Sequence, residues 1–232
     1  MKTRNKIVTY IEHSHKRAMN ERKQYPLYDS INVFVKDNPP KNVQIQAVVD
    51  DIERIIPSHM LYGVDTVYVG QFQDLIDRSV NAIYDSGAIY VTNLQDNNMD
   101  MLDDIIHEIA HAAESTYGYE IYGDGILEQE FLGKRSRMRQ ILKFQKHDVE
   151  KYDFFDVEYS KEFDEFLYQD VGYDMLNNLT NNLFSSPYGA TSLREYFANG
   201  FEHFYLGNPK YVMQTSPVLF GKLQLLHSLE KQ

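Results

Sequence analysis

The stretch DDIIHEIAHAAEST, residues 103–116, contains two histidines four positions apart, with a glutamate directly after the first. Apolar side chains recur around it at helical spacing, at Leu102, Ile105, Ile106, Ile109 and Ala113. This pattern predicts an amphipathic helix, with Asn98 as its N-cap and Gly118 as the residue that ends it.

Side chains four residues apart on a helix share one face, with Cβ atoms about 6 Å apart. His107 and His111 can therefore direct one imidazole nitrogen each toward a single cation. Glu108 projects nearby and could reach a water molecule on that cation without binding the cation itself. This is the H-E-x-x-H arrangement, in which the glutamate serves as a general base. The alternative is a helix whose histidines make ordinary hydrogen bonds, and the amphipathic context favours the metal site.

The overall composition limits the kinds of partner. The formal net charge is −11 and cysteine is absent, so any metal must be held by histidine, aspartate or glutamate. The negative charge opposes binding to nucleic acid and to anionic membranes. No stretch reaches the roughly 18 apolar residues of a membrane span, and residues 1–24 lack the apolar core of a secretory signal. We therefore expect no nucleic-acid or membrane partner. The protein should stay in the cytoplasm of its producing cell or leave it by a route without a signal peptide.

Strand-like and helix-like segments are distributed unevenly along the chain. The first half is predicted to contain a helix over 45–56 and strands within 31–42, 65–72 and the hairpin 80–93. The second half is predicted to be helical over 126–145, 160–184, 191–206 and 216–230. This order predicts a single α+β domain over residues 1–232. Its N-terminal α/β lobe, with a small mixed sheet, would span about 30–117, and a mostly helical lobe about 118–232. A cleft is expected where the lobes meet, close to the H-E-x-x-H helix.

A catalytic zinc ion needs a third protein ligand and one open position. The glycine and histidine of the metzincin pattern are absent, because Glu114 and Tyr117 stand in their places. A glutamate is therefore expected, and two compete. Glu130 follows His111 after eighteen residues, the spacing of aminopeptidase-type gluzincins. Glu195 lies further on, in a helix that mixes small, apolar and acidic residues.

A tyrosine stands seven residues before the second of these glutamates. Tyr188 lies in a loop just ahead of the helix that carries Glu195. From there it could donate a hydrogen bond to the oxyanion of a peptide-hydrolysis intermediate.

The sequence HEIAH at 107–111, followed by Tyr188 and by EYFANGF at 195–201, resembles the catalytic domain of the anthrax lethal factor family of zinc metalloproteases. That family includes secreted Pro-Pro endopeptidases. Its pattern is H-E-x-x-H, then a tyrosine seven residues before a glutamate that opens E-[FY]-F-A-E-x-F. The resemblance covers about 103–116 and 186–205.

The resemblance implies a zincin-like fold and one Zn²⁺ per chain. It implies three zinc ligands, which are His107, His111 and Glu195. It also implies Glu108 as the general base and Tyr188 as a donor to the transition state. No organic cofactor is expected.

Two departures from the family pattern stand out. Asn199 occupies the position of the second acidic residue of the family's helix. The interval between His111 and Glu195 is also long, which predicts an inserted helical segment over about 126–165. Such an insert could cover or narrow the cleft.

Several residues near the motif have two interpretations. Three carboxylates lie one helical turn from a ligand and could orient its imidazole, or simply be solvated acids, namely Asp103, Asp104 and Glu114. His203 is interpreted as a packing residue. The basic run GKRSRMRQILK at 133–143 is interpreted as a solvated helix face, with a polyanion contact as the alternative.

Together these features predict a zinc-dependent endopeptidase that hydrolyses peptide bonds with a metal-activated water and Glu108 as general base. A peptide or protein substrate would bind in an extended conformation along AIYVTN, residues 88–93, as the edge strand. One alternative is a catalytically degenerate zincin-fold module that binds without turnover. Another is a nucleic-acid accessory protein that uses 133–143, which the net charge opposes. The cleavage preference and the oligomeric state stay open.

Overall fold

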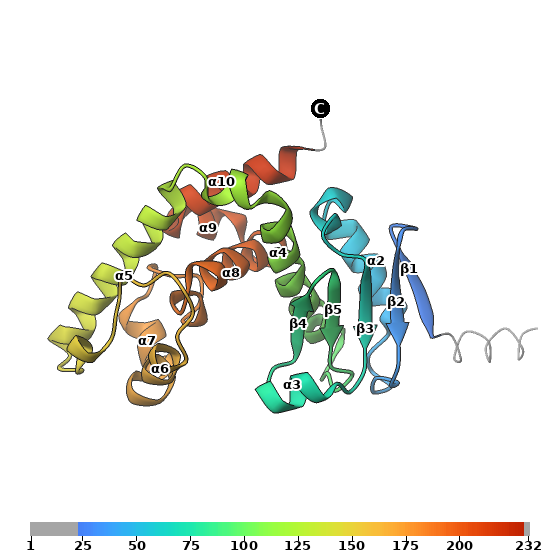
Figure 1. Cartoon of the computed structure of the whole chain (residues 1–232), viewed down its shortest axis with the longest axis horizontal. Coiled ribbons are helices and arrows are strands. Elements are labelled where there is room, and N and C mark those ends of the chain that lie inside the picture. Colours follow the sequence, from blue (N-terminus) through green and yellow to red (C-terminus); the bar gives the residue numbers. More distant parts are fainter. Residues whose placement is uncertain (1–22, 230–232) are drawn as a thin grey trace, which may run out of the picture.

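The computed structural model describes residues 23–229 (Figure 1). The N-terminal stretch in which no secretory signal is recognised lies almost wholly outside this range. A five-stranded mixed sheet comes first along the chain, and helices make up most of the remainder. The predicted α+β order is therefore confirmed. The long helix α4 (Asn98–Tyr122) stands between the sheet and the helical part (Figure 1).

The sheet has the strand order β1-β2-β3-β5-β4. Its strands are β1 (Gln24–Leu27), β2 (Ile31–Val35), β3 (Thr66–Val69), β4 (Ala82–Asp85) and β5 (Ala88–Val91). The three inner strands are parallel, and β1 and β4 pair antiparallel at the two edges. Val67 and Ile89 belong to the buried face of the sheet, and α2 (Ile45–Ile55) contributes Val48 and Ile52 to the same core.

The predicted hairpin exists, but its strands are placed differently from the expectation. Ser86 and Gly87 both have positive φ, 48° and 91°, as two-residue hairpin turns require. The AIYVTN segment was expected at the edge, and this was wrong. Because β5 pairs with β3 as well as with β4, it is an inner strand, and β4 forms the edge.

Helix α4 begins and ends differently from the sequence prediction. Its N-cap is Asn97, whose side chain accepts hydrogen bonds from the backbone of Met99 and Asp100, rather than Asn98. Asn98 Oδ1 instead accepts from the backbone nitrogen of Gln44, at 2.7 Å. Gly118 does not end the helix. Tyr117 is non-helical (φ −112°, ψ 22°), and the helix continues past this kink to Tyr122.

The helical part is more broken than its sequence pattern suggests. It contains α5 (Ile126–Phe144), α6 (Lys161–Glu165), α7 (Tyr173–Leu179), α8 (Leu193–Tyr205), α9 (Pro209–Thr215) and α10 (Pro217–Ser228). The helix predicted over 160–184 is interrupted by a π-helical turn and by Gly172, whose φ is 84°. Helices α9 and α3 (Gln73–Arg78) and strand β1 were not predicted. Every helix within residues 23–229 is too short or too polar to cross a lipid bilayer.

The basic run on α5 is only partly a solvated face. Lys134 and Arg135 are buried, 7% and 1% exposed. Lys134 donates to the carbonyl oxygens of Leu183 and Thr215, at 2.5 and 2.7 Å. Arg135 donates to three backbone carbonyl oxygens, those of Asp153, Asp156 and Thr191, and its guanidinium carbon lies 4.0 Å from the centre of the Phe163 ring. The interpretation as a solvated face is therefore wrong for these two cations, which hold loops of the helical part together.

Candidate metal centre

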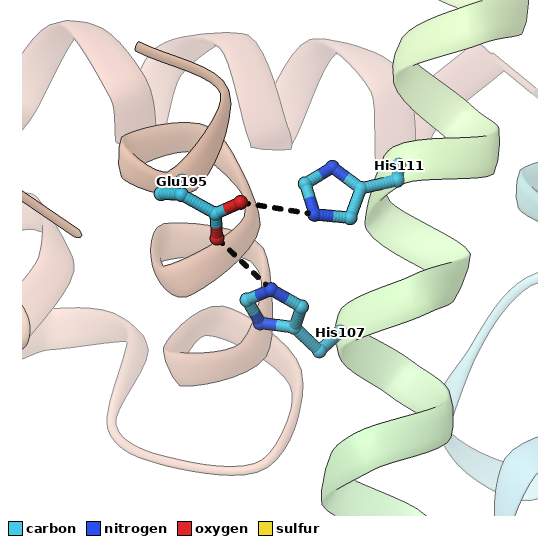
Figure 2. A group of neighbouring side chains, drawn as sticks. All are labelled: His107, His111 and Glu195. Carbon is cyan, nitrogen blue, oxygen red and sulfur yellow. Dashed lines mark hydrogen bonds and ion pairs between the residues drawn. The ribbon is translucent and has the colours of Figure 1, made fainter. Parts of the chain in front are cut away.

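Two helices bring three candidate ligands together. His107 and His111 lie one turn apart on α4, and Glu195 lies in the first turn of α8 (Figure 2). Ser192 caps α8, since its Oγ accepts a hydrogen bond from the Glu195 backbone nitrogen at 3.1 Å. One ligand atom from each of the three residues lies within 4.8 Å of the other two.

This group fits zinc in chemistry and in spacing. Two imidazole nitrogens and one carboxylate oxygen form a donor set that zinc accepts. Ligand atoms bound tetrahedrally at about 2.0–2.1 Å stand roughly 3.3 Å apart. His107 Nε2 lies 3.1 Å from Glu195 Oε2, and His111 Nε2 lies 3.6 Å from Glu195 Oε1. These distances reach the two oxygens of one carboxylate, and one ligand atom from each of the three residues lies within 4.8 Å of the other two, so a modest side-chain adjustment would let the group hold one ion.

The competing glutamate has a different role. Glu130 accepts hydrogen bonds from the backbone nitrogens of Val218 and Leu219, at 2.9 and 3.2 Å, and from the Tyr196 hydroxyl at 2.8 Å. Glu130 therefore accepts hydrogen bonds from backbone nitrogens in the first turn of α10, which have no acceptor within the helix itself. The structure brings Glu195 to the two histidines, and it does not bring Glu130.

Each histidine has a carboxylate at the ring nitrogen that faces away from Glu195. His107 Nδ1 lies 3.4 Å from Glu202 Oε2, and His111 Nδ1 lies 3.4 Å from Glu114 Oε2. Such partners fix the orientation of a metal-binding imidazole. From the sequence, Glu114 had two interpretations, this role or that of a solvated acid, and the structure places it at His111 Nδ1.

The partner of His107 was not anticipated. The sequence left Asp103 and Asp104 as either partners of His107 or solvated acids. Glu202 makes that contact, and Asp104 accepts from Gln95 at 2.7 Å. Glu202 stands two helical turns after Glu195, which places both residues on one face of α8. This spacing is the signal by which Glu202 could have been found in the sequence.

The carboxylates govern protonation in the metal-free site. Burial alone would lower the pKa of His107, but hydrogen bonds to Glu195 and Glu202 outweigh it and raise that pKa to about 10. Burial opposes ionisation of Glu195, yet the two histidines hold its pKa below the ordinary value. The metal-free site therefore contains an imidazolium between two carboxylates.

Glu108 is tied to the edge of the sheet. It is buried on α4, and its Oε2 accepts a hydrogen bond from the backbone nitrogen of Tyr84 on β4, at 2.6 Å. Burial raises the pKa of Glu108, and the neighbouring His111 and His107 partly offset this. A carboxyl group with a raised pKa accepts a proton more readily near neutral pH.

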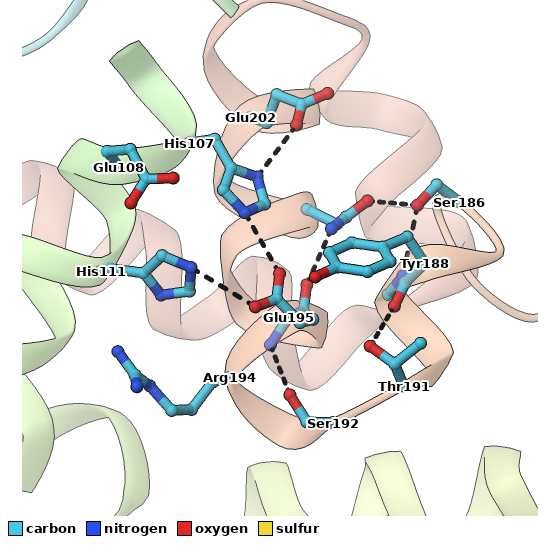
Figure 3. A network of polar contacts seen from close by, with 12 residues as sticks. His107, Glu108, His111, Ser186, Tyr188, Thr191, Ser192, Arg194, Glu195 and Glu202 are labelled. Atoms are coloured by element: carbon cyan, nitrogen blue, oxygen red, sulfur yellow. Dashed lines mark hydrogen bonds and ion pairs between the residues drawn. The ribbon is translucent and has the colours of Figure 1, made fainter. Parts of the chain in front are cut away.

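Tyr188 faces the same site from a short 3-10 turn, Tyr188–Ala190 (Figure 3). Asn199, buried on α8, fixes this turn, because its Oδ1 accepts a hydrogen bond from Ser186 Oγ. Ser186 Oγ in turn accepts from the backbone nitrogen of Gly189 at 3.3 Å. Asn199 therefore anchors the turn that carries Tyr188 and does not contact either histidine. His203 Nδ1 lies 3.1 Å from the Asn199 carbonyl oxygen, outside the ligand group.

All five predicted site residues line one cleft of about 890 Å³. Its lining includes residues of helix α3, strand β4 and helix α4, together with Tyr188, Arg194 and Glu195. Its lining residues come from 72–111 and 188–195, so within the described chain the 126–165 segment lines none of it.

Comparisons of the chain with models of protein families, with curated proteins and with solved structures found no match.

Proposed function

We propose that this protein is a zinc-dependent endopeptidase with a zincin-like fold, similar to the anthrax lethal factor family. One observation carries the proposal. The His107, His111 and Glu195 ligand atoms converge within 4.8 Å on the wall of an open cleft that also contains Glu108 and Tyr188. A purely structural metal site would be closed by a fourth protein ligand. Within residues 23–229, the group contains three.

The edge strand supports binding of an extended peptide. Asn81 accepts a backbone hydrogen bond from Thr92, so alternate residues from Asn81 onward pair with β5. The backbone groups of Ala82 and Tyr84 consequently face away from β5. Because the Tyr84 nitrogen already donates to Glu108, a substrate chain could pair with the Ala82 nitrogen and with the carbonyl oxygens of Ala82 and Tyr84. A substrate chain would form hydrogen bonds there largely without regard to its sequence.

The side chains of the site match the steps of peptide hydrolysis. A zinc ion bound there would supply Lewis acidity, which polarises a carbonyl group and acidifies a water molecule. Glu108 would accept the proton from that water and later deliver it to the leaving amine. Tyr188 would donate a hydrogen bond to the oxygen atom on which negative charge develops. Glu202 and Glu114 would hold the two imidazoles in place.

The test combines metal content with turnover. Zinc per chain is measured by plasma mass spectrometry in the wild type, in Glu195→Ala, and in Glu128→Ala as an exposed control on α5. We expect about one zinc in the wild type and the control, and much less in Glu195→Ala. Cleavage of a random peptide library is then compared between the wild type and Glu108→Gln.

The outcomes separate the candidate functions. Cleavage by the wild type that is lost in Glu108→Gln, with zinc retained, supports the endopeptidase. One zinc per chain and specific peptide binding without any cleavage would instead support the degenerate, non-catalytic module. Equal zinc in the wild type and Glu195→Ala would contradict the ligand assignment.

A further inference from the structure

Arg194 lies directly before Glu195 and lines the cleft beside the ligand group (Figure 3). Its Nε donates to Glu114 Oε2 at 2.9 Å. Glu114 also accepts from the Tyr122 hydroxyl at 2.5 Å and lies 3.4 Å from His111 Nδ1. The guanidinium group is thus fixed by a carboxylate that is itself held from two other directions.

The outer edge of this guanidinium group is free to bind a ligand. The Arg194 side chain is 59% exposed. Within residues 23–229, only its Nε forms a hydrogen bond or ion pair, which leaves the Nη1 and Nη2 donors available. Because Nε is already fixed, a ligand would not have to order the whole side chain, which lowers the entropic cost of binding.

The charged side chains in the rest of the cleft lining are mainly acidic. Apart from the candidate catalytic residues, it contains four aspartates, which are Asp74, Asp77, Asp85 and Asp104. Arg78 on α3 is the other arginine of the lining. An acidic substrate group would be repelled near these aspartates and attracted near the two arginines, of which Arg194 lies beside the ligand group. Such a pattern would fix the register in which a peptide binds.

We propose that Arg194 forms a subsite for a carboxylate group of the substrate, close to the bond that is cleaved. The carboxylate belongs to an aspartate or glutamate side chain or to a free C-terminus. Two parallel N–H donors match the two oxygens of a carboxylate, whereas a neutral peptide carbonyl offers a single acceptor atom. The inference rests on the proposed function and adds a substrate class to it, namely peptides with an acidic group at one defined position.

Equilibrium binding tests the subsite without requiring turnover. Zinc-loaded Glu108→Gln protein is titrated into fluorescent peptides in which one glutamate or one glutamine is moved through every position. Each peptide is prepared with an amidated and with a free C-terminus. We expect glutamate at one position, or the free C-terminus, to bind about tenfold more tightly than its neutral counterpart, as charged hydrogen bonds typically provide.

Variants then assign the preference to one side chain. Arg194→Gln should abolish it, Arg194→Lys should retain only a small part, and Arg78→Gln should leave it intact. Zinc per chain is measured in each variant. If Arg194→Gln loses zinc, the acidic preference of Arg194→Lys is used instead to test the subsite. An equal loss of acidic and neutral peptide binding in the Arg194 variants would overturn the subsite. So would the absence of any acidic preference, or of any peptide binding. Peptide binding is measured with the Glu108→Gln protein, which does not need to cleave the peptide. The binding result therefore stands even if the wild type shows no hydrolysis.

Discussion

Nδ1 of His107 lies 3.4 Å from Oε2 of Glu202, while Nε2 of the same ring faces Glu195 at 3.1 Å. One imidazole is therefore held between two carboxylates that stand two turns apart on α8 (Figure 3). If zinc takes the Nε2 side, Glu202 still fixes the orientation of the ring. The first three predictions follow from this arrangement.

Removing the charge of Glu202 should weaken metal binding without removing a ligand. We expect Glu202→Gln to lower zinc affinity by about tenfold or more, the usual effect of losing a carboxylate partner of a metal-binding histidine. Competition with a chromophoric chelator measures the affinity. Glu120→Gln, an exposed position on α4, serves as the control and should bind zinc like the wild type. Unchanged affinity in Glu202→Gln would show that its contact with His107 is incidental.

Zinc binding should release a proton from His107. Its pKa in the metal-free fold is about 10, against an ordinary value of 6.5. At pH 8 the ring is therefore protonated in the metal-free protein and must lose that proton to bind zinc. Calorimetric titration in buffers of different ionisation enthalpy should report about one proton released per zinc. A value near zero at pH 8 would mean that the ring is already neutral.

The same raised pKa has a consequence for stability. A group whose pKa is raised on folding stabilises the fold fully at pH values below its pKa in the unfolded chain. This contribution is lost as the pH rises through its pKa in the folded protein. The free energy of unfolding of the metal-free protein should therefore fall between pH 6.5 and about 10. Urea titrations in chelator measure it. The decline should be shallower in Glu202→Gln, because one of the two carboxylates that raise the pKa is neutralised.

Tyr188 and Ser186 should act as one unit. Tyr188→Phe should lower kcat by about a hundredfold, the typical cost of losing one oxyanion donor. Ser186→Ala removes the hydrogen bond to Asn199 and should lower kcat by a smaller factor, with zinc content unchanged. Adding Ser186→Ala to Tyr188→Phe should then have little further effect. Effects that multiply in the double variant would mean that Ser186 does not act through Tyr188.

Glu130 should matter for folding and not for metal binding. Glu130→Ala leaves the donors of Tyr196, Val218 and Leu219 without their acceptor, which should cost about 2 kcal/mol or more of unfolding free energy. Urea denaturation checks this, with Glu128→Ala as the exposed control. Zinc per folded chain should equal that of the wild type. Loss of zinc from the folded variant would reopen the assignment of the third ligand.

The sequence alone determined the features that depend on local spacing. The apolar stripe around His107 and His111 predicted α4 as a helix with both imidazoles on one face, since residues four apart share a face regardless of context. The β-branched runs on either side of Ser86-Gly87 predicted a hairpin for a similar reason. The change from strands to helices predicted the α+β order.

Only the tertiary structure decided which distant side chains meet. Glu130 and Glu195 were both plausible ligands by spacing, and the packing of α8 against α4 brings Glu195 to the histidines, while Glu130 is taken up by α10. Spacing also could not show that β5 lies inside the sheet, because an edge strand is defined by its neighbours. The roles of Glu202 and Arg194 likewise depend on contacts between helices far apart in the sequence. Local periodicity sets the face on which a side chain lies, and the packing of those faces decides what that side chain can bind.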